Sequence, residues 1–395
     1  MKNVRLGDIA TIYNGNSINK NIKTEKYTKN VPGWNYVGTK DVDFDGSINY
    51  NTGVVIPYAE TGFRVAPKGT VFVCSEGGSA GKKTALVKED VCFGNKLFAI
   101  VNEKGLFDEK YIFFYTRYAK FSEQFKLLAT SLMGGISAKN FSAIEIPLVS
   151  VKEQKRIVNK IEELFSELDS AVETLKRTKE QLAVYRQSVL KDAFSRFSSK
   201  EIILNHSELV TSGSRGWAQY YSEQGARFIR ITDLTRDRIV LKNDDVQYVA
   251  LPNNVEGKRS RLMANDILVS ITADLGSIAL VPEDIEEAYI NQHIALVRLK
   301  NPDVAKFIAL YLKSDWGQKD LLRNKRGGGK LGLGLDDIRN TPIPIVSNDI
   351  ACKVVSQIES RLTVCDNIEK TVNDALAQAE AMRQSILKKA FEGSL

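Results

Sequence analysis

The feature that most constrains this chain is an internal repeat with a long period. The segment Arg186–Phe194 recurs as Arg383–Phe391 with seven of its nine residues identical, and 383 minus 186 gives an offset of 197 residues. The same offset aligns Ile146–Ser150 with Ile343–Ser347, so both ends of one element repeat without a gap. Self-similarity at a fixed offset indicates a duplicated architecture. We therefore expect two copies of one long element.

Each copy is predicted to be a long helix. The segment from Lys152 to Phe194 contains no Pro or Gly, and Ser150 with Glu153 predicts a capping box just before it. Apolar residues recur at spacings of three and four, as in a coiled-coil seam. The predicted seam residues are Ile157, Ile161, Leu164, Leu168, Ala171, Leu175, Leu182, Tyr185 and Val189 in the first copy, and Val354, Ile358, Cys365, Ile368, Val372, Ala375, Ala379, Met382 and Ile386 in the second.

The length of these helices predicts how they pack. A helix of about 43 residues is roughly 65 Å long, which one small domain cannot bury. The two helices should therefore pack on each other. Because the first leads from one globular segment to the next and the second must return, we expect them to be antiparallel.

The segments before each helix are predicted to be mixed, β-rich domains. Short β-branched or aromatic runs alternate with Gly, Asn and Asp turns and precede one helix. In the first domain we expect strands at Val71–Cys74 and Leu97–Val101 and a helix at about Glu109–Leu128; in the second, strands at Ile267–Ile271 and Ile294–Leu299 and a helix at about Val304–Arg323. A looser match at offset 196 pairs Asn95 with Asn291 and Ala99 with Ala295.

These elements predict an α+β fold in which two β-rich domains are separated by two long antiparallel coiled-coil helices with pseudo-two-fold symmetry. The predicted division is 1–148 for the first domain, 149–197 for the central helix, 198–344 for the second domain and 345–395 for the C-terminal helix. Such a pair of related domains resembles a dimer fused into one chain.

Composition excludes several classes of function. The longest apolar runs are far shorter than the roughly 20 residues of a membrane span, and no apolar signal core begins the chain, so a cytoplasmic protein is expected. Four cysteines without a CxxC pair and two histidines suggest neither a disulfide framework nor a metal site. The segment Glu76–Thr84 fails the spacing of a phosphate-binding loop, and no catalytic constellation or bound cofactor is expected. The net charge of +7 favours a polyanionic partner.

Several loops combine small residues, amides and basic residues, the combination needed to approach DNA phosphates and base edges. The candidate DNA-binding residues are Asn14, Ser17, Lys20, Ser79, Lys82, Lys83, Ser137, Lys139 and Asn140 in the first domain, and Ser214, Arg215, Trp217, Tyr220, Tyr221, Arg230, Thr232, Arg323, Lys325, Arg326 and Lys330 in the second. Any single loop is equally well a solvated turn. The three aromatic residues could instead lie in the core, and Arg230 and Thr232 could pair internally.

The order of domain, repeated helix, domain, repeated helix resembles the specificity subunits of type I restriction-modification systems over essentially the whole chain. The resemblance is carried by Leu6–Ala10 and Leu204–Gly213 at the domain openings, by Glu153–Val158 at the first helix, and by Ser212–Tyr221, which is similar to the opening of one class of target-recognition domain. The second helix has Ile350 and Ala351 where the first has the Glu-Gln pair, so equivalent partner contacts there are in doubt.

The resemblance implies a non-catalytic role. Each domain would read one half of a bipartite, asymmetric site in double-stranded DNA, and the helices would set the spacer and dock two methyltransferase subunits. Those subunits would bind S-adenosylmethionine, and restriction or translocase subunits would complete the assembly. The alternatives are a coiled-coil adaptor without DNA specificity and an intact enzyme with an unrecognised active site.

The basic loop of the second domain gives a first prediction. Replacing Arg326 and Lys330 by alanine should weaken DNA binding, because each removes a charge expected to neutralise a phosphate. Binding of duplex DNA measured over a range of salt concentrations tests this, and unchanged binding would contradict the assignment.

Overall fold

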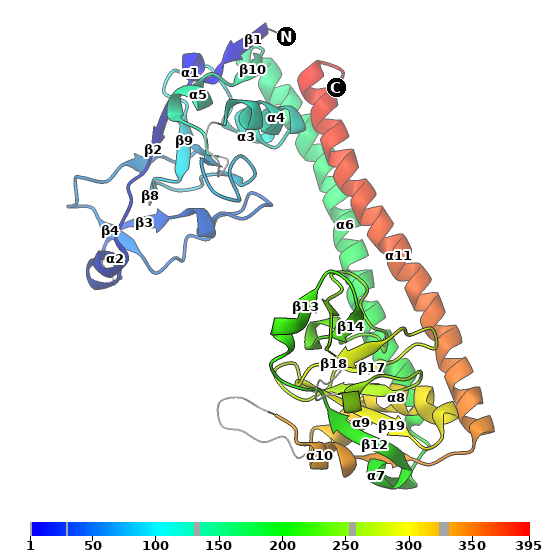
Figure 1. Ribbon diagram of the computed structural model, residues 1–395. Coiled ribbons are helices and arrows are strands. Elements are labelled where there is room, and N and C mark those ends of the chain that lie inside the picture. Colours follow the sequence, from blue (N-terminus) through cyan, green and yellow to red (C-terminus); the bar gives the residue numbers. More distant parts are fainter. Residues whose placement is uncertain (1, 29–30, 130–134, 253–257, 324–331) are drawn as a thin grey trace. The chain divides into compact units, whose positions relative to one another are not determined.

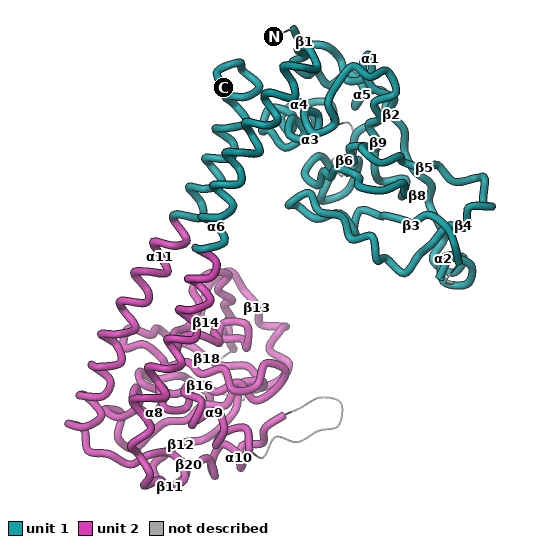
Figure 2. The backbone as a smooth tube through the Cα atoms, turned by 180° about the vertical axis from the view of Figure 1, so that it is seen from behind, with its two compact units in different colours: residues 1–174, 375–395 teal, residues 175–374 magenta. Residues whose placement is uncertain are grey.

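The computed structural model describes residues 2–28, 31–129, 135–252, 258–323 and 332–395 (Figure 1). The chain forms two compact units (Figure 2). Unit 1 consists of residues 1–174 and 375–395, and unit 2 consists of residues 175–374. Each unit therefore contains one globular domain and one part of each long helix. No helix among the described residues is long and apolar enough to cross a membrane.

Unit 1 is built on two four-stranded sheets and a two-stranded one. The strand orders are β2-β9-β6-β7, β4-β3-β8-β5 and β1-β10. The strands are β1 Lys2–Arg5, β2 Thr11–Asn14, β3 Gly33–Val37, β4 Val55–Pro57, β5 Val65–Ala66, β6 Val71–Cys74, β7 Thr84–Leu86, β8 Val91–Phe93, β9 Leu97–Val101 and β10 Glu145–Leu148. The shorter helices are α1 Leu6–Ile9, α2 Lys20–Lys26, η1 Thr39–Asp41, α3 Glu109–Thr116, α4 Ala119–Leu128 and α5 Ala138–Ser142.

Unit 2 has the same plan. Its sheets have the orders β12-β19-β16-β17, β13-β15-β14-β18 and β11-β20. The strands are β11 Lys200–Ile202, β12 Ser207–Ser212, β13 Tyr221–Ser222, β14 Ala226–Ile229, β15 Tyr248–Val249, β16 Ile267–Ser270, β17 Ile278–Leu280, β18 Ala288–Ile290, β19 Ile294–Leu299 and β20 Pro342–Pro344. The shorter helices are α7 Ile203–His206, η2 Trp217–Tyr220, η3 Ile231–Asp233, η4 Lys258–Ser260, η5 Pro302–Val304, α8 Ala305–Lys313, α9 Asp315–Leu321 and α10 Leu335–Arg339.

The strand register confirms the duplication and corrects its alignment. Cys74 pairs with Leu97 across β6 and β9, and Ser270 pairs with Ile294 across β16 and β19. The offset is therefore 196 in the first strand of each pair but 197 in the second. The predicted match of Asn95 with Asn291, and of Ala99 with Ala295, is wrong by one residue. The sequence alignment paired residues of the same type that lie one position away from the true match. In a strand, a shift of one residue moves every side chain to the opposite face of the sheet.

The predicted helix at Glu109–Leu128 is two helices, α3 and α4, and the one at Val304–Arg323 is likewise α8 and α9. Ser314 ends α8 in an extended conformation, and its hydroxyl accepts a hydrogen bond from the amide of Gly317 as the N-cap of α9. A Cβ at Gly317 would lie 2.1 Å from the carbonyl oxygen of Tyr311. The sharp bend therefore requires both the serine cap and the glycine.

The two long helices are α6 Val151–Phe194 and α11 Asn348–Glu392. The hydroxyl of Ser150 accepts a hydrogen bond from the amide of Glu153, whereas the Glu153 carboxylate pairs with Arg156. Only the serine half of the predicted capping box is therefore present. In the first turn of α6, the Glu153 carboxylate forms an ion pair with Arg156 instead of accepting a hydrogen bond from the backbone amide of Ser150.

The long helices run antiparallel in both units. In unit 1 Arg383 of α11 pairs with Asp169 of α6, and in unit 2 Arg186 of α6 lies 2.7 Å from Asp366 of α11. Since 169 plus 197 is 366 and 186 plus 197 is 383, these are two copies of one contact. The predicted α+β fold with two antiparallel helices is confirmed.

The predicted seam is only partly correct. Tyr185, Ile368 and Met382 are 49%, 41% and 51% exposed, whereas Arg186 is 7% exposed. Arg186 takes a place between the helices because Asp366 and Glu369 neutralise its charge there. A period of apolar residues could not reveal an ion pair inside the seam.

Each domain packs on both long helices. One helix contributes a phenylalanine to the domain core, and the other contributes aliphatic residues. In unit 1 Phe391 of α11 contacts Tyr111 and Tyr115 of α3, with both pairs of ring centroids 5.1 Å apart. In unit 2 Phe194 of α6 contacts Phe307 and Tyr311 of α8 at 5.3 and 5.4 Å. The core of unit 1 also includes Ile157 and Ile161 of α6, and that of unit 2 includes Val354 and Ile358 of α11. Each core is therefore closed by two helices that are distant in sequence.

This packing predicts the effect of truncating Phe391, which is 4% exposed. Phe391→Ala should lower the free energy of unfolding of unit 1 by about 3 to 5 kcal/mol, because burial is lost and a cavity remains. Hydrogen exchange should become faster in β6 and β9 but not in β16 and β19. Met382→Ala, at an exposed position of the same helix, is the control. Equal exchange in the two variants would show that α11 does not support unit 1.

Candidate nucleic-acid interface

Unit 2 contains a broad groove of about 930 Å³ at the end of its β12-β19-β16-β17 sheet. Its lining includes four residues predicted to bind DNA, together with residues from the β16 and β19 ends and the start of α10. The lining residues are Ser212, Gly213, Ser214, Arg215, Trp217, Gln219, Tyr220, Pro252, Arg259, Ile271, Thr272, Gln292, Leu333, Gly334 and Leu335. The groove is rich in amides and hydroxyls and contains two arginines, a set suited to phosphates and base edges.

A glycine aligns the loop that enters this groove. A Cβ at Gly213 would lie 1.9 Å from the carbonyl oxygen of Ile290, so only glycine allows the chain to pass that close. Gly15 has the same relation to Phe93 in unit 1, also at 1.9 Å. The loops that follow β2 and β12 thus leave their sheets in the same way. This equivalence supports one kind of surface at both places.

The aromatic residues of the unit 2 loop serve different purposes. Trp217 is 4% exposed and its ring stacks on Phe228 and packs against Tyr289 at centroid distances of 5.5 and 5.3 Å. Tyr220 packs against the same cluster and is half-buried, whereas Tyr221 is 46% exposed. Trp217 therefore holds the loop as a core residue, which is the alternative that the sequence left open.

Two lining residues of the groove, Thr272 and Gln292, are joined through His293 in a hydrogen-bonded chain. Nδ1 of His293 lies 2.7 Å from Oγ1 of Thr272, and Nε2 of His293 lies 2.9 Å from Nε2 of Gln292. All three side chains are half-buried. The backbone amide of His293 is also bonded to the Asn291 side chain at 3.1 Å. These contacts fix the orientation of the Gln292 amide within the groove.

The corresponding place in unit 1 has charged residues. Nζ of Lys96 lies 2.9 Å from a carboxylate oxygen of Glu76. The hydrogen bond from Lys96 to that carboxylate raises the pKa of Lys96. Asn14 lies beside them, and its amide donates to the carbonyl oxygen of Asn95 at 2.8 Å.

The other predicted residues of this part of unit 1 are distributed along two segments. Ser17 and Lys20 are exposed after β2. Ser137 caps α5 by accepting a hydrogen bond from the amide of Asn140, and Lys139 is exposed on the same short helix. Asn140 is tied to the carbonyl oxygen of Leu128 at 2.9 Å. Ser17, Lys20 and Lys139 are thus accessible to a ligand, whereas Asn140 is used by the fold.

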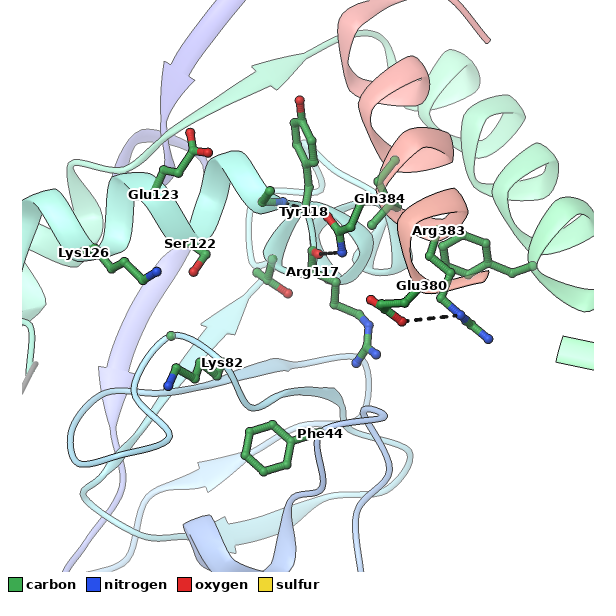
Figure 3. A pocket seen from close by; sticks show the side chains of 15 residues that line it. Phe44, Lys82, Arg117, Tyr118, Ser122, Glu123, Lys126, Glu380, Arg383 and Gln384 are labelled. Atoms are coloured by element: carbon green, nitrogen blue, oxygen red, sulfur yellow. Dashed lines mark hydrogen bonds and ion pairs between the residues drawn. The ribbon is translucent and has the colours of Figure 1, made fainter. Parts of the chain in front are cut away.

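Lys82 lies on a different surface, a cavity of about 400 Å³ beside α4 and the end of α11 (Figure 3). Arg117, Lys126 and Arg383 line the same cavity together with Glu123 and Glu380. Burial lowers the pKa of Arg117, and Arg383 lowers it further. A corresponding cavity of about 350 Å³ in unit 2 contains Lys313, whose pKa burial lowers to about 8.

The neighbours of Lys82 have structural contacts. The carbonyl oxygen of Ser79 accepts hydrogen bonds from the amides of Lys82 and Lys83. Nζ of Lys83 lies 3.3 Å from the carbonyl oxygen of Thr39 and 5.1 Å from the centre of the Phe44 ring. The loop around Lys82 is therefore folded on itself, and of the three predicted residues Ser79, Lys82 and Lys83 only Lys82 is exposed.

Two predicted residues of unit 2 take part in internal pairing. Arg230 donates to the backbone of Asp245 at 2.6 Å, and its own amide donates to the Asp233 carboxylate at 2.7 Å. The Thr232 hydroxyl also lies beside Asp233, at 3.4 Å. Arg230 and Thr232 are not among the residues that line the groove. Arg323 is exposed after α9, and Lys325, Arg326 and Lys330 lie outside the described residues.

Comparisons with known proteins address the family directly. The family model described as "Type I restriction modification DNA specificity domain" matches residues 1–182 and 228–378. This chain belongs to that family. One matched segment lies in each half of the internal repeat. The family match therefore agrees with the duplication.

Individual relatives agree with the family model. The chain is 27% identical to the EcoBI specificity subunit of Escherichia coli over 66% of its own length and 60% of that protein, so the match spans less than two thirds of this relative. It is 25% identical to the StySPI specificity subunit of Salmonella potsdam over 84% of this chain and 76% of that protein. Both relatives are named as specificity subunits, which gives no support to the alternative of a coiled-coil adaptor without DNA specificity.

Solved structures agree on the fold. A chain from a study of complex assembly and conformational transition of the type I R-M system aligns with a TM-score of 0.74 and 16% identity. The alignment covers 100% of this chain and 98% of that one. At this identity the likeness shows the arrangement of the chain and not its DNA preference.

The sequence analysis did not identify three lining residues of the groove, Arg259, Thr272 and Gln292, or His293, which bonds to two of them. The repeat contained a usable signal. Aligned at the offsets of 196 and 197 that the strands show, Glu76 corresponds to Thr272 and Lys96 to His293, next to strands that match closely. Differences of charge at the equivalent strand ends of a duplicated scaffold indicate candidate positions for selecting different ligands.

The groove predicts opposite effects for two residues of one loop. Trp217→Ala should lower the free energy of unfolding of unit 2 by about 3 to 5 kcal/mol through loss of core packing. Arg215→Ala, at an exposed position, should leave unfolding unchanged, weaken DNA binding, and reduce the slope of log affinity against log salt by about 1. Thermal unfolding and DNA titrations at several salt concentrations measure both. The reverse pattern would contradict this division of roles.

Proposed function

We propose that this chain is a non-catalytic subunit that recognises the DNA sequence for a type I restriction-modification enzyme. Each unit reads one half of a bipartite, asymmetric site, and the long helices set the number of base pairs between the halves. The observation that carries the proposal is the pair of units with one fold and chemically different side chains at equivalent strand ends. A duplicated scaffold with Glu76 and Lys96 in one copy and Thr272 and His293 in the other suits two unrelated half-sites.

The mechanism follows from the chemistry of the two kinds of contact. Exposed basic residues such as Arg215 and Lys20 supply salt-dependent affinity for phosphates without selecting a sequence. Amide, hydroxyl and charged groups of the grooves supply the selection, at about 1 to 3 kcal/mol for each good bidentate contact. The base pairs between the half-sites are not contacted, so their number is determined by the scaffold.

Methyl transfer belongs to partner subunits in this proposal. Two methyltransferase subunits bind S-adenosylmethionine, take the target adenine out of the duplex and modify it. Restriction or translocase subunits join the same assembly, in the cytoplasm, where DNA and its modification enzymes meet. This chain provides the position on DNA.

Exposed apolar residues on the long helices support docking of these partners. In unit 2, Val184 and Tyr185 of α6 are 71% and 49% exposed, and Val364 and Ile368 of α11 are 56% and 41% exposed. Large apolar side chains that remain in water on a helix pair are typical of an interaction surface. A methyltransferase subunit that covers them would bury the part of the scaffold that the domains leave open.

The proposal predicts a new methylation pattern. A host that expresses this chain with its methyltransferase subunit should acquire methyladenine at one bipartite motif, and a host without this chain should not. Sequencing of modified bases measures the motif and its spacer. An active methyltransferase that gives no motif would favour the adaptor alternative, and methyl transfer by this chain alone would favour an enzyme.

A matched deletion sharpens the same experiment. Removing residues 174–180 and 371–377 takes one heptad, about two helical turns, from each helix at equivalent points. The scaffold then shortens by about 10 Å, or about three base pairs of DNA. We expect both half-sites to be retained with a spacer shorter by about three base pairs. An unchanged spacer would show that the helices do not determine it.

A further inference from the structure

The hydrogen-bonded chain in the unit 2 groove has a fixed direction. The amide nitrogen Nε2 of Gln292 can donate hydrogen bonds but cannot accept them, so Nε2 of His293 is the acceptor. The imidazole proton is then on Nδ1, which donates to the Thr272 hydroxyl. One amide hydrogen of Gln292 is used in this way.

The rest of the Gln292 amide is available to a ligand. Among the described residues, its Oε1 and its second N–H have no hydrogen-bond partner. The side chain lines the groove with Thr272, Ser214 and Arg215. Gln292 therefore presents one acceptor and one donor, side by side and in a fixed orientation, to whatever enters the groove.

This pair of groups has one complementary base edge in the major groove of DNA. Adenine presents N7 as an acceptor and its N6 amino group as a donor, so a glutamine amide forms two hydrogen bonds with it. Guanine presents two acceptors, N7 and O6, and would place O6 against the acceptor of the amide. An oriented glutamine therefore prefers adenine over guanine.

The corresponding positions of unit 1 support a role in base selection. Strand register places Asn95 at the position of Gln292, Lys96 at that of His293 and Glu76 at that of Thr272. The contact between the two strand ends is retained, at 2.9 Å for Lys96 and Glu76 and 2.7 Å for His293 and Thr272, but its chemistry is different. Two domains that select different bases need such equivalent positions with different chemistry.

We propose that Gln292 contacts an adenine in the half-site read by unit 2, and that His293 and Thr272 are positioning residues that orient its amide. This inference rests on the proposed function and names the base that one groove selects. The equivalent cluster of Asn95, Lys96 and Glu76 selects the base at the matching place of the other half-site.

The test uses the complex of this chain with its methyltransferase subunit and a pool of DNA duplexes in which each half-site position is randomised in turn. Sequencing of the bound duplexes gives the preference at every position. Gln292→Ala should reduce the preference for adenine at one position of one half-site by about five- to 150-fold and leave the other half-site unchanged. Gln292→Glu retains the shape of the side chain but lacks its donor. It should shift that position towards cytosine, whose amino group donates a hydrogen bond to a carboxylate.

The positioning residues have their own readout. His293→Ala and Thr272→Val should relax the same position, and Gln292→Ala combined with His293→Ala should be no worse than Gln292→Ala alone, because both act through one amide. Gln357→Ala, at an exposed site on α11, is the matched control and should keep the whole motif. Lys96→Ala should alter only the other half-site.

The outcomes separate the two proposals. If the wild-type complex selects no bipartite site, the proposed function fails. If it does and Gln292→Ala retains the adenine preference, the inference about Gln292 is overturned. A uniform loss of binding at all positions, with an unchanged unfolding temperature, would also overturn it, since the side chain would then supply affinity and not selection.

Discussion

The structure depends on the burial of each domain's first core helix against two long helices at once. Neither α3 nor α8 is covered by its own domain alone; α3 is covered by Phe391 and α8 by Phe194, aromatic residues that come from the opposite repeat. Aromatic packing of this kind contributes a large part of a core's stability. Because equivalent phenylalanines, Phe391 and Phe194, close the two cores, the attachment of each domain to the long helices is part of its folded core.

Duplication has preserved contacts of the scaffold and changed those of the grooves. Lys110 pairs with Glu162 and Lys306 with Glu359, and the Arg–Asp contacts between the long helices recur in the same way. The exits of β2 and β12 retain a glycine where a side chain would meet backbone. At the strand ends beyond these points, Glu76 and Thr272 occupy equivalent positions and differ in chemical character. A scaffold that keeps these shared contacts lets recognition change without a change of fold.

The amount that could be predicted from sequence varied with the kind of pattern. The extent of α6 and the strands β6, β9 and β19 matched expectation, because long apolar periods and β-branched runs are strong local signals. The bend at Ser314 and the buried Arg186 did not, since a cap inside a helical pattern and an ion pair inside a seam contradict the local period. Trp217 is an example from the candidate site. An aromatic residue in a polar loop can either contact DNA or lie in the core, and only its burial in the structure distinguishes the two. Gln292 was missed because its orientation depends on a hydrogen-bonded chain through His293 to Thr272, which is 20 residues away in the sequence.

The discontinuity of unit 1 has a consequence for biosynthesis. Unit 2 is one uninterrupted stretch, residues 175–374, whereas unit 1 also needs residues 375–395. A ribosome therefore releases everything that the second domain requires before it has made the last piece of the first. During that interval the aromatic face of α3, the site of Phe391, is open. The domain translated first is the last to be completed, and a nascent chain is most exposed to aggregation or to a chaperone at its beginning.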